Sequence, residues 1–127
     1  MNLEKVIFGF FIVLAMTLNF SFVYGEVTDP QHHNVIEFFL VLVVNLIATS
    51  LKLGDRTQLG ALLLATSLVA DLQLIAAALI WTYATHVSAS GMTEGITVLI
   101  VSHAAGALLS NVISVTMVVA EALMLRR

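Results

Sequence analysis

One carboxylate stands alone inside a long apolar run of the sequence. Asp71 follows Leu59 by twelve residues and is the only charged residue between Leu59 and Tyr83. On a helix this separation is about 18 Å, at 1.5 Å per residue. An ionisable side chain in such surroundings is costly and marks a candidate functional site. Its chemistry would be the binding of a cation or the exchange of a proton.

Three other polar residues fall near the middle of apolar runs and can join Asp71. Asn45 and Asn111 lie in two other runs, and Ser67 lies one helical turn before Asp71. Carboxylate, amide and hydroxyl oxygens suit hard cations. The four residues therefore predict an ion or proton site. The alternative is a protonated aspartate that hydrogen-bonds to the asparagines and holds helices together.

Histidines give two further candidates. His103 lies near the start of the last apolar run, where an imidazole can relay protons near neutral pH; a structural hydrogen bond is the alternative. His32, His33 and Glu37 lie close together in the chain, and imidazole with carboxylate suits zinc or another divalent ion. This predicts an outer cation cluster without a fixed ligand count, so the metal is unspecified. The alternative is a solvated acidic loop.

Small and polar residues also indicate how helices pack. A row with four-residue spacing consists of Ser102, Gly106, Ser110 and Ser114, and such rows let helices approach closely. Gln73 points about 200° away from Asp71 on a helix and shares its face with Ala77. We therefore expect Gln73 and Ala77 to meet another subunit of a homo-oligomer. The alternative is that one bundle already covers both faces.

The sequence carries no motif of an enzyme. There is no His-Glu-x-x-His and no phosphate loop, and the neighbours Ser102 and His103 point about 100° apart on a helix, so they cannot form a nucleophile and base. Without cysteine, disulfides and thiolate metal sites are excluded. The five basic residues are scattered, which argues against nucleic acid as a partner. We expect neither an enzyme nor a bound cofactor.

The elements that must position these residues follow from composition. Hydrophobic residues make up 60% of the 127 residues and charged residues 10%, against roughly half and a quarter in a soluble domain. Apolar runs cover residues 6–24, 35–53, 59–83 and 95–125, and about 20 residues suffice to span a bilayer as a helix. The runs do not alternate polar and apolar residues as barrel strands do. They predict one all-α domain, an antiparallel bundle of four transmembrane helices.

Charge predicts the orientation of this bundle. Lys5 precedes the first run, Lys52 and Arg56 flank the turn between the second and third, and Arg126 and Arg127 end the chain. Because Lys and Arg favour the cytoplasmic side, both termini are predicted to be cytoplasmic, in a bacterial inner membrane. One alternative is that the first run is a signal peptide cleaved after Gly25.

Turn residues predict where the helices end. Gly25 and Gly54 can end helices in the left-handed conformation. Asp29, which Pro30 follows in the chain, is expected to cap the second helix. Asp55 is expected to cap the third helix.

Two resemblances accompany these patterns. The stretch from His32-His33-Asn34 through Gly54-Asp55-Arg56-Thr57-Gln58 to Ala65–Gln73 resembles a family of short bacterial inner-membrane proteins without an assigned function. Leu53-Gly54-Asp55-Arg56-Thr57 is similar to the Glu-x-Gly-Asp-Lys/Arg-Ser/Thr motif of a calcium and manganese exchanger family, in which acidic residues line the ion path. Here Lys52 stands in place of the glutamate, and the motif occurs once.

Taken together, these patterns predict a channel or transporter subunit for a monovalent or divalent cation. The subunit acts as a homo-oligomer in the lipid bilayer. The alternative is an accessory subunit that packs against a larger partner and transports nothing itself.

Overall fold

The computed structural model describes residues 2–25 and 28–125, and the regular secondary structure of this part of the chain is helical, without a strand. The elements are α1 (Leu3–Val23), the 3₁₀ helix η1 (Pro30–His32), α2 (Val35–Lys52), α3 (Gln58–His86) and α4 (Glu94–Leu125). All four α-helices are long and apolar enough to cross a membrane. The prediction of an all-α chain with four such helices is confirmed, and each helix begins and ends within three residues of its predicted bounds.

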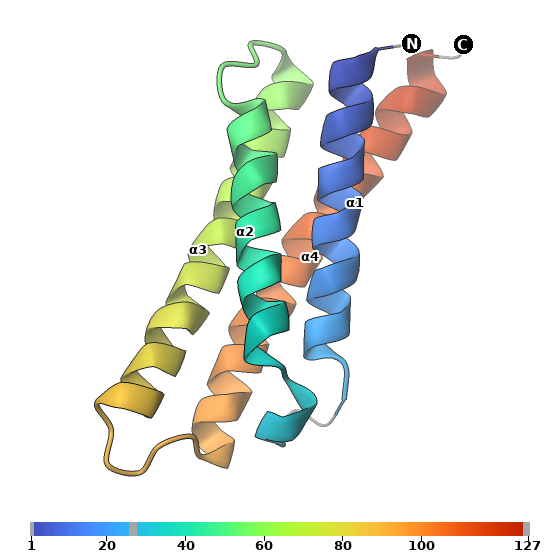
Figure 1. The fold of residues 1–127 in the computed structure, drawn as a ribbon. Coiled ribbons are helices and arrows are strands. Elements are labelled where there is room, and N and C mark those ends of the chain that lie inside the picture. The colour runs from blue at the N-terminus through green and yellow to red at the C-terminus, as the bar shows by residue number, and fades with distance from the viewer. Residues whose placement is uncertain (1, 26–27, 126–127) are drawn as a thin grey trace.

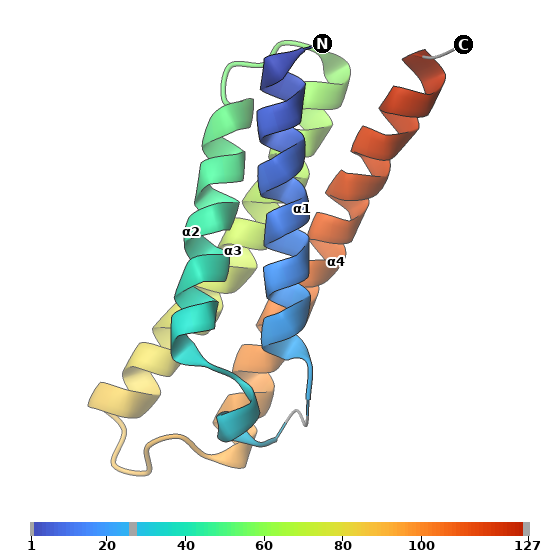
Figure 2. The ribbon, with the colours of Figure 1, turned by 45° about the vertical axis from the view of Figure 1, so that its right-hand side comes forward.

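The four helices form one bundle whose chain turns back after each helix (Figure 1). Both termini and the α2–α3 turn lie at one end, which we call the terminal end, and the α3–α4 loop lies at the other, the loop end. Figure 2 shows the last turns of α4 leaning away from α1.

Side chains of residues just before each helix explain where the helices begin. Asn34 caps α2, with its Oδ1 accepting from the Ile36 N–H at 2.7 Å. Thr57 caps α3, with its Oγ1 accepting from the Gly60 N–H at 2.9 Å. Each bond satisfies a backbone donor that the helix leaves unpaired.

The predicted caps Asp29 and Asp55 are wrong, although both side chains do bind backbone nearby. Asp29 caps the short η1 instead of α2, because Pro30 begins a single 3₁₀ turn that ends before Asn34. Asp55 accepts from the N–H of Thr57 at 2.9 Å, and so shapes the turn that precedes the true cap. Gly54 has the predicted left-handed conformation, with φ +86°.

The core consists of two apolar clusters with polar residues between them. The cluster toward the loop end includes Phe22, Phe38, Leu74 and Ile100. The cluster toward the terminal end consists of the buried residues Phe8, Ile12, Ala48 and Leu63. Between them, every helix contributes buried polar side chains, which we call the polar layer: Asn19, Asn45, Thr49, Ser67, Asp71, Ser110, Asn111 and Ser114. Buried polar groups are costly unless they are hydrogen-bonded, so the partners of this layer decide what it does.

Candidate functional site

Asp71 lies in the polar layer and contacts α2 through one carboxylate oxygen. Its side chain is 5% exposed, and its Oδ2 accepts from Thr49 Oγ1 at 2.5 Å. The same Thr49 hydroxyl lies 2.9 Å from the backbone oxygen of Asn45. A hydroxyl has one hydrogen to donate, so Thr49 can donate fully to only one of these two acceptors.

Three buried oxygens of this region have no hydrogen-bond partner: Ser67 Oγ, Asp71 Oδ1 and Asn111 Oδ1. Ser67 lies one turn from Asp71 on the same face of α3. Thr66 of α3 and Ser114 of α4 share a 2.6 Å hydrogen bond. This register puts Asn111 of α4 at about the depth of Ser67 and Asp71. A hydroxyl, a carboxylate and an amide oxygen without partners therefore lie at similar depths in the bundle. A proton or a small cation is the kind of species that such a set can hold.

The predicted asparagine partners of Asp71 do not bond to it. Asn45 turns to its own helix, donating Nδ2–H to the Val41 oxygen at 2.8 Å. Thr49, which the sequence reasoning missed, is the partner instead. The available signal was its position one turn after Asn45 and thus on the same face of α2. It is weak, because threonine in a helix ordinarily bonds the carbonyl four residues earlier.

The second polar face of α3 packs against α4 of the same chain. His103 donates its Nδ1–H to Gln73 Oε1 at 2.6 Å, and Ala77 is fully buried in the core. Ala77 is therefore covered within the chain, contrary to the prediction that it meets another subunit. Gln73 is half-buried against α4, and its contact with another subunit stays a prediction. A relay role of His103 stays a prediction.

The small-residue row of α4 packs within the chain only in part. Ser102 is exposed, while Ser110 and Ser114 are buried. The reason is geometric, since a step of four residues turns by about 40° beyond a full circle on a helix. Gly106 lies between these extremes, and a Cβ there would come within 3.3 Å of the Gln73 side chain. The part of the row from Gly106 to Ser114 therefore contributes to helix packing, and Ser102 does not.

The predicted outer cation cluster does not form. His33 donates its Nδ1–H to the Phe22 oxygen at 2.7 Å, Glu37 accepts from the Ser21 hydroxyl at 2.7 Å, and His32 pairs with Asp29 at 3.5 Å. Residues 2–25 and 28–125 contain no group of three or more His, Cys, Asp or Glu side chains that could hold a metal ion. The physical reason is that α2 begins at Val35, so His33 lies in the preceding turn, on no common helical face with Glu37.

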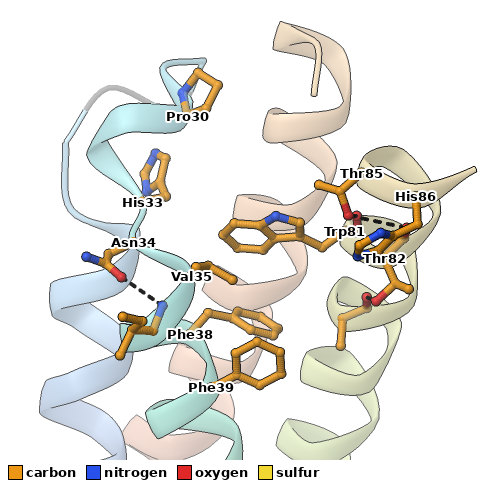
Figure 3. Close-up of a pocket in the computed structure, with 12 residues that line it drawn as sticks. Pro30, His33, Asn34, Val35, Phe38, Phe39, Trp81, Thr82, Thr85 and His86 are labelled. Carbon is orange, nitrogen blue, oxygen red and sulfur yellow. Dashed lines mark hydrogen bonds between the residues drawn. The ribbon is translucent and has the colours of Figure 1, made fainter. Parts of the chain in front are cut away.

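A groove of about 690 Å³ opens between α2 and α3 at the loop end. Figure 3 shows Trp81 of α3 reaching toward Phe38 and Phe39 of α2, and the ring centroids of Trp81 and Phe38 lie 5.5 Å apart. Threonine and histidine side chains form its rim on the side of α3: Thr82, Thr85 and His86. The groove separates α2 from α3 on the side of Asp71 that faces the loop end.

The segment that resembles the exchanger motif is an exposed turn at the terminal end. Asp55 accepts from the Thr57 hydroxyl at 2.7 Å and pairs with Lys52 at 3.5 Å. These hydrogen bonds from Thr57, with the charge of Lys52, hold the pKa of Asp55 below its ordinary 3.8. Asp71 lies about 20 Å further along α3, so Asp55 belongs to the turn and not to the polar layer.

Comparison with known proteins gives one family. A family model described as "Family of unknown function (DUF6394)" matches residues 32–122. No curated protein and no solved structure gives a significant match, and the comparisons lend no support to the exchanger resemblance. The matched region contains α2, α3 and most of α4, and with them all of the polar layer except Asn19. The chain therefore belongs to the DUF6394 family, whose function is unknown.

Proposed function

We propose that this membrane protein transports a cation and that Asp71 is the group that binds and releases it, with the proton as the favoured ion. The observation that carries the proposal is the contact of Thr49 with two acceptors. If Asp71 is protonated, its Oδ2–H donates to Thr49 Oγ1 and the Thr49 hydroxyl donates to the Asn45 oxygen. One added proton thus completes both short contacts.

The unpartnered oxygens support the same proposal. Ser67 Oγ, Asn111 Oδ1 and Asp71 Oδ1 are all buried in the polar layer without a hydrogen-bond partner. Leaving buried polar atoms unpaired costs about 1–3 kcal/mol each, and such a group calls for an explanation, of which a functional role or a bound ion is one. A proton or small cation bound at Asp71 would give its free carboxylate oxygen a partner.

A path to Asp71 must open, because the residue is buried within the chain. The groove beside Trp81 and the single hydrogen bond between Thr49 and Asp71 make the α2–α3 contact the candidate route. A homo-oligomer would shelter this route from lipid, and oligomerisation remains part of the proposal. Because Ala77 is buried and Gln73 is half-buried within the chain, we expect most of the subunit contact on other surfaces.

The proposed orientation in a bacterial inner membrane has both termini in the cytoplasm. It is supported by the basic residues of the terminal end, Lys5, Lys52 and Arg56, because such residues favour the cytoplasmic side. The chain has no cysteine of its own. The labelling of single cysteines introduced at Asn2, Gly54 and Ser90 therefore measures the orientation of the chain in the membrane. Only the cysteine at position 90 should react with a membrane-impermeant reagent in intact cells. Labelling of all three positions would contradict this topology.

An accessory role is the second candidate, and a specific observation favours it. The Thr49–Asp71 bond joins α2 to α3, and interhelical hydrogen bonds of this kind hold bundles together. In that case the polar layer serves assembly alone.

Proton flux into reconstituted vesicles separates the two candidates. Asp71→Asn keeps the size and can still donate to Thr49, but it cannot release a proton, so flux should fall to the level of empty vesicles while thermal stability is retained. Asp55→Asn is the matched control, since Asp55 lies outside the polar layer, and its flux should equal that of the wild type.

Two results would contradict the transport proposal. One is a wild-type protein whose vesicles take up neither protons nor alkali cations faster than empty vesicles. The other is unchanged flux in Asp71→Asn together with a clear loss of stability in Asp71→Leu, which would assign Asp71 to assembly.

A further inference from the structure

Two cavities meet at the terminal end of the bundle, where α4 leans away from α1 (Figure 2). One, of about 450 Å³, lies among α1, α3 and α4 and reaches the α2–α3 turn. The other, of about 430 Å³, lies between α3 and α4. Leu59 and Glu121 line both cavities, so the two are neighbours with a common wall.

The first cavity combines charged groups with an apolar floor. Lys5 lies 3.3 Å from Glu121 and Lys52 lies 3.5 Å from Asp55, so two ammonium groups and two carboxylates line one space. The floor is apolar and includes Phe8, whose ring centroid lies 4.3 Å from the Lys52 ammonium. This is a compartment for a small group that carries both signs of charge.

The second cavity is apolar apart from Glu121. Its walls come from α3 and α4: Leu59, Leu62, Met117, Ala120 and Met124. A saturated chain fits such walls, and methionine adapts to irregular shapes. A charged compartment beside an apolar one is complementary to a molecule with a polar head and an acyl chain.

The position of the two cavities fits such a molecule. Lys5 lies in the first turn of α1, Lys52 ends α2, and Glu121 lies near the end of α4. Helix ends lie near the headgroup level when helices cross a bilayer. Basic groups between helix ends at this level bind lipid headgroups.

We propose that the two cavities bind one phospholipid whose headgroup carries a phosphate and a primary ammonium, as in phosphatidylethanolamine. The phosphate accepts from Lys5 or Lys52, and the ammonium donates to Glu121 or Asp55. An acyl chain lies between α3 and α4.

Charge balance selects this lipid over its relatives. Each lysine already has a carboxylate within 4 Å. A headgroup with a phosphate but no cation would draw a lysine away and leave Asp55 or Glu121 without a positive partner. A choline headgroup has no N–H to offer the carboxylates. Asp55 stays ionised at neutral pH, because Thr57 and Lys52 lower its pKa.

Native mass spectrometry of the purified full chain tests the proposal with three lipids of equal acyl chains: phosphatidylethanolamine, phosphatidylcholine and phosphatidylglycerol. The occupancy of the first adduct should be about tenfold higher for phosphatidylethanolamine, which corresponds to 1.4 kcal/mol. The double variant Lys5→Gln/Glu121→Gln should reduce it to the level of phosphatidylcholine. Thr85→Val, at the loop end, is the control and should leave it unchanged.

A second variant covers the case in which the double variant fails to fold. Leu62→Trp fills the apolar cavity and leaves every charge in place, and it should also abolish the preferred adduct. Equal occupancy by the three lipids would overturn the proposal. So would a preference for phosphatidylglycerol, a preference that survives both variants, or a wild-type dimer that Leu62→Trp dissociates, since the last result assigns the cavities to a second copy of the chain.

Discussion

The two sides of α3 are joined to their neighbours in different ways. Toward α4, two side-chain hydrogen bonds cross the contact, Thr66 with Ser114 and Gln73 with His103, and Gly106 lets the backbones approach. Toward α2, the side-chain hydrogen bonds of the described residues cross the contact only at Thr49 and Asp71. The α3–α4 contact is thus fixed at two depths and the α2–α3 contact at one.

This difference bears on how a buried carboxylate can exchange an ion. Interhelical hydrogen bonds in membranes contribute about 0.6 kcal/mol on average, so opening a contact held by one bond costs less than opening one held by two. The aromatic groove beside Trp81 further reduces the packing between α2 and α3 at the loop end. If Asp71 exchanges an ion as proposed, we expect α2 to move relative to α3 and α4, which move together.

The largest effect is expected at the tightest point of the α3–α4 contact. In Gly106→Leu, a side chain must enter where a Cβ alone would come within 3.3 Å of Gln73. Overpacking of this kind costs about 1–3 kcal/mol, measured as the free energy of unfolding in mixed micelles. Gly9→Leu is the control, because nothing lies within 4 Å of a Cβ at Gly9. Equal stability of the two variants would show that the α3–α4 contact is not tight.

The next effect concerns the single bond of the α2–α3 contact. Thr49→Val removes the hydroxyl between Asp71 and the Asn45 oxygen. The unfolding free energy should fall by about 1–2 kcal/mol, because a buried carboxyl loses its partner. In Thr116→Val, a hydroxyl that bonds only the Val112 oxygen of its own helix is lost, and stability should change by less than about 0.5 kcal/mol.

Thr49→Val also tests the proposed motion. If this bond holds the route to Asp71 closed, transport of the ion should change in this variant and remain as in the wild type in Thr116→Val. Identical flux in the two variants would remove the α2–α3 contact from the mechanism.

The sequence predicted the polar layer better than its pairings. The depth of Asp71, Asn45 and Asn111 follows from residue counts, since the rise of a helix is fixed. Which side chains bond depends on the rotation and tilt of each helix, and these depend on the packing of all neighbours. Thr49 was therefore not predicted as the partner of Asp71, although the sequence places it one helical turn after Asn45.

The same limit explains why Ala77 of α3 was misassigned. Periodicity showed two polar faces, but it cannot show whether α4 or another subunit covers the second one. The caps failed for a more local reason. Asp, Asn and Thr all accept from backbone N–H groups, and the turn conformation selected Asn34 and Thr57 over Asp29 and Asp55.

A smaller effect is expected from the hydrogen bond between Gln73 and His103, which is the bond of the α3–α4 contact nearer the loop end. A double-mutant cycle with Gln73→Leu and His103→Phe should give a coupling energy of about 0.6 kcal/mol, and not above ~1.7 kcal/mol. The measurement is again unfolding in mixed micelles. A coupling energy of zero would mean that this pair does not fix α3 against α4, and the comparison would then depend on Thr66 and Ser114 alone.

The smallest effect is expected at the turn that links α2 to α3. Asp55 accepts from Thr57, and these bonds keep its pKa below the ordinary 3.8. A carboxyl whose pKa is lower in the folded state stabilises the fold above its unfolded pKa, and this stabilisation is lost as the pH falls through the folded pKa. The difference in melting temperature between wild type and Asp55→Asn should therefore be small and constant from pH 7 to about pH 5 and vanish in stronger acid. Thr57→Ser keeps the donor hydroxyl and should retain the pH dependence of the wild type. A difference that persists unchanged in strong acid would mean that the charge of Asp55 does not stabilise the turn, and that the α2–α3 contact is held from the polar layer alone.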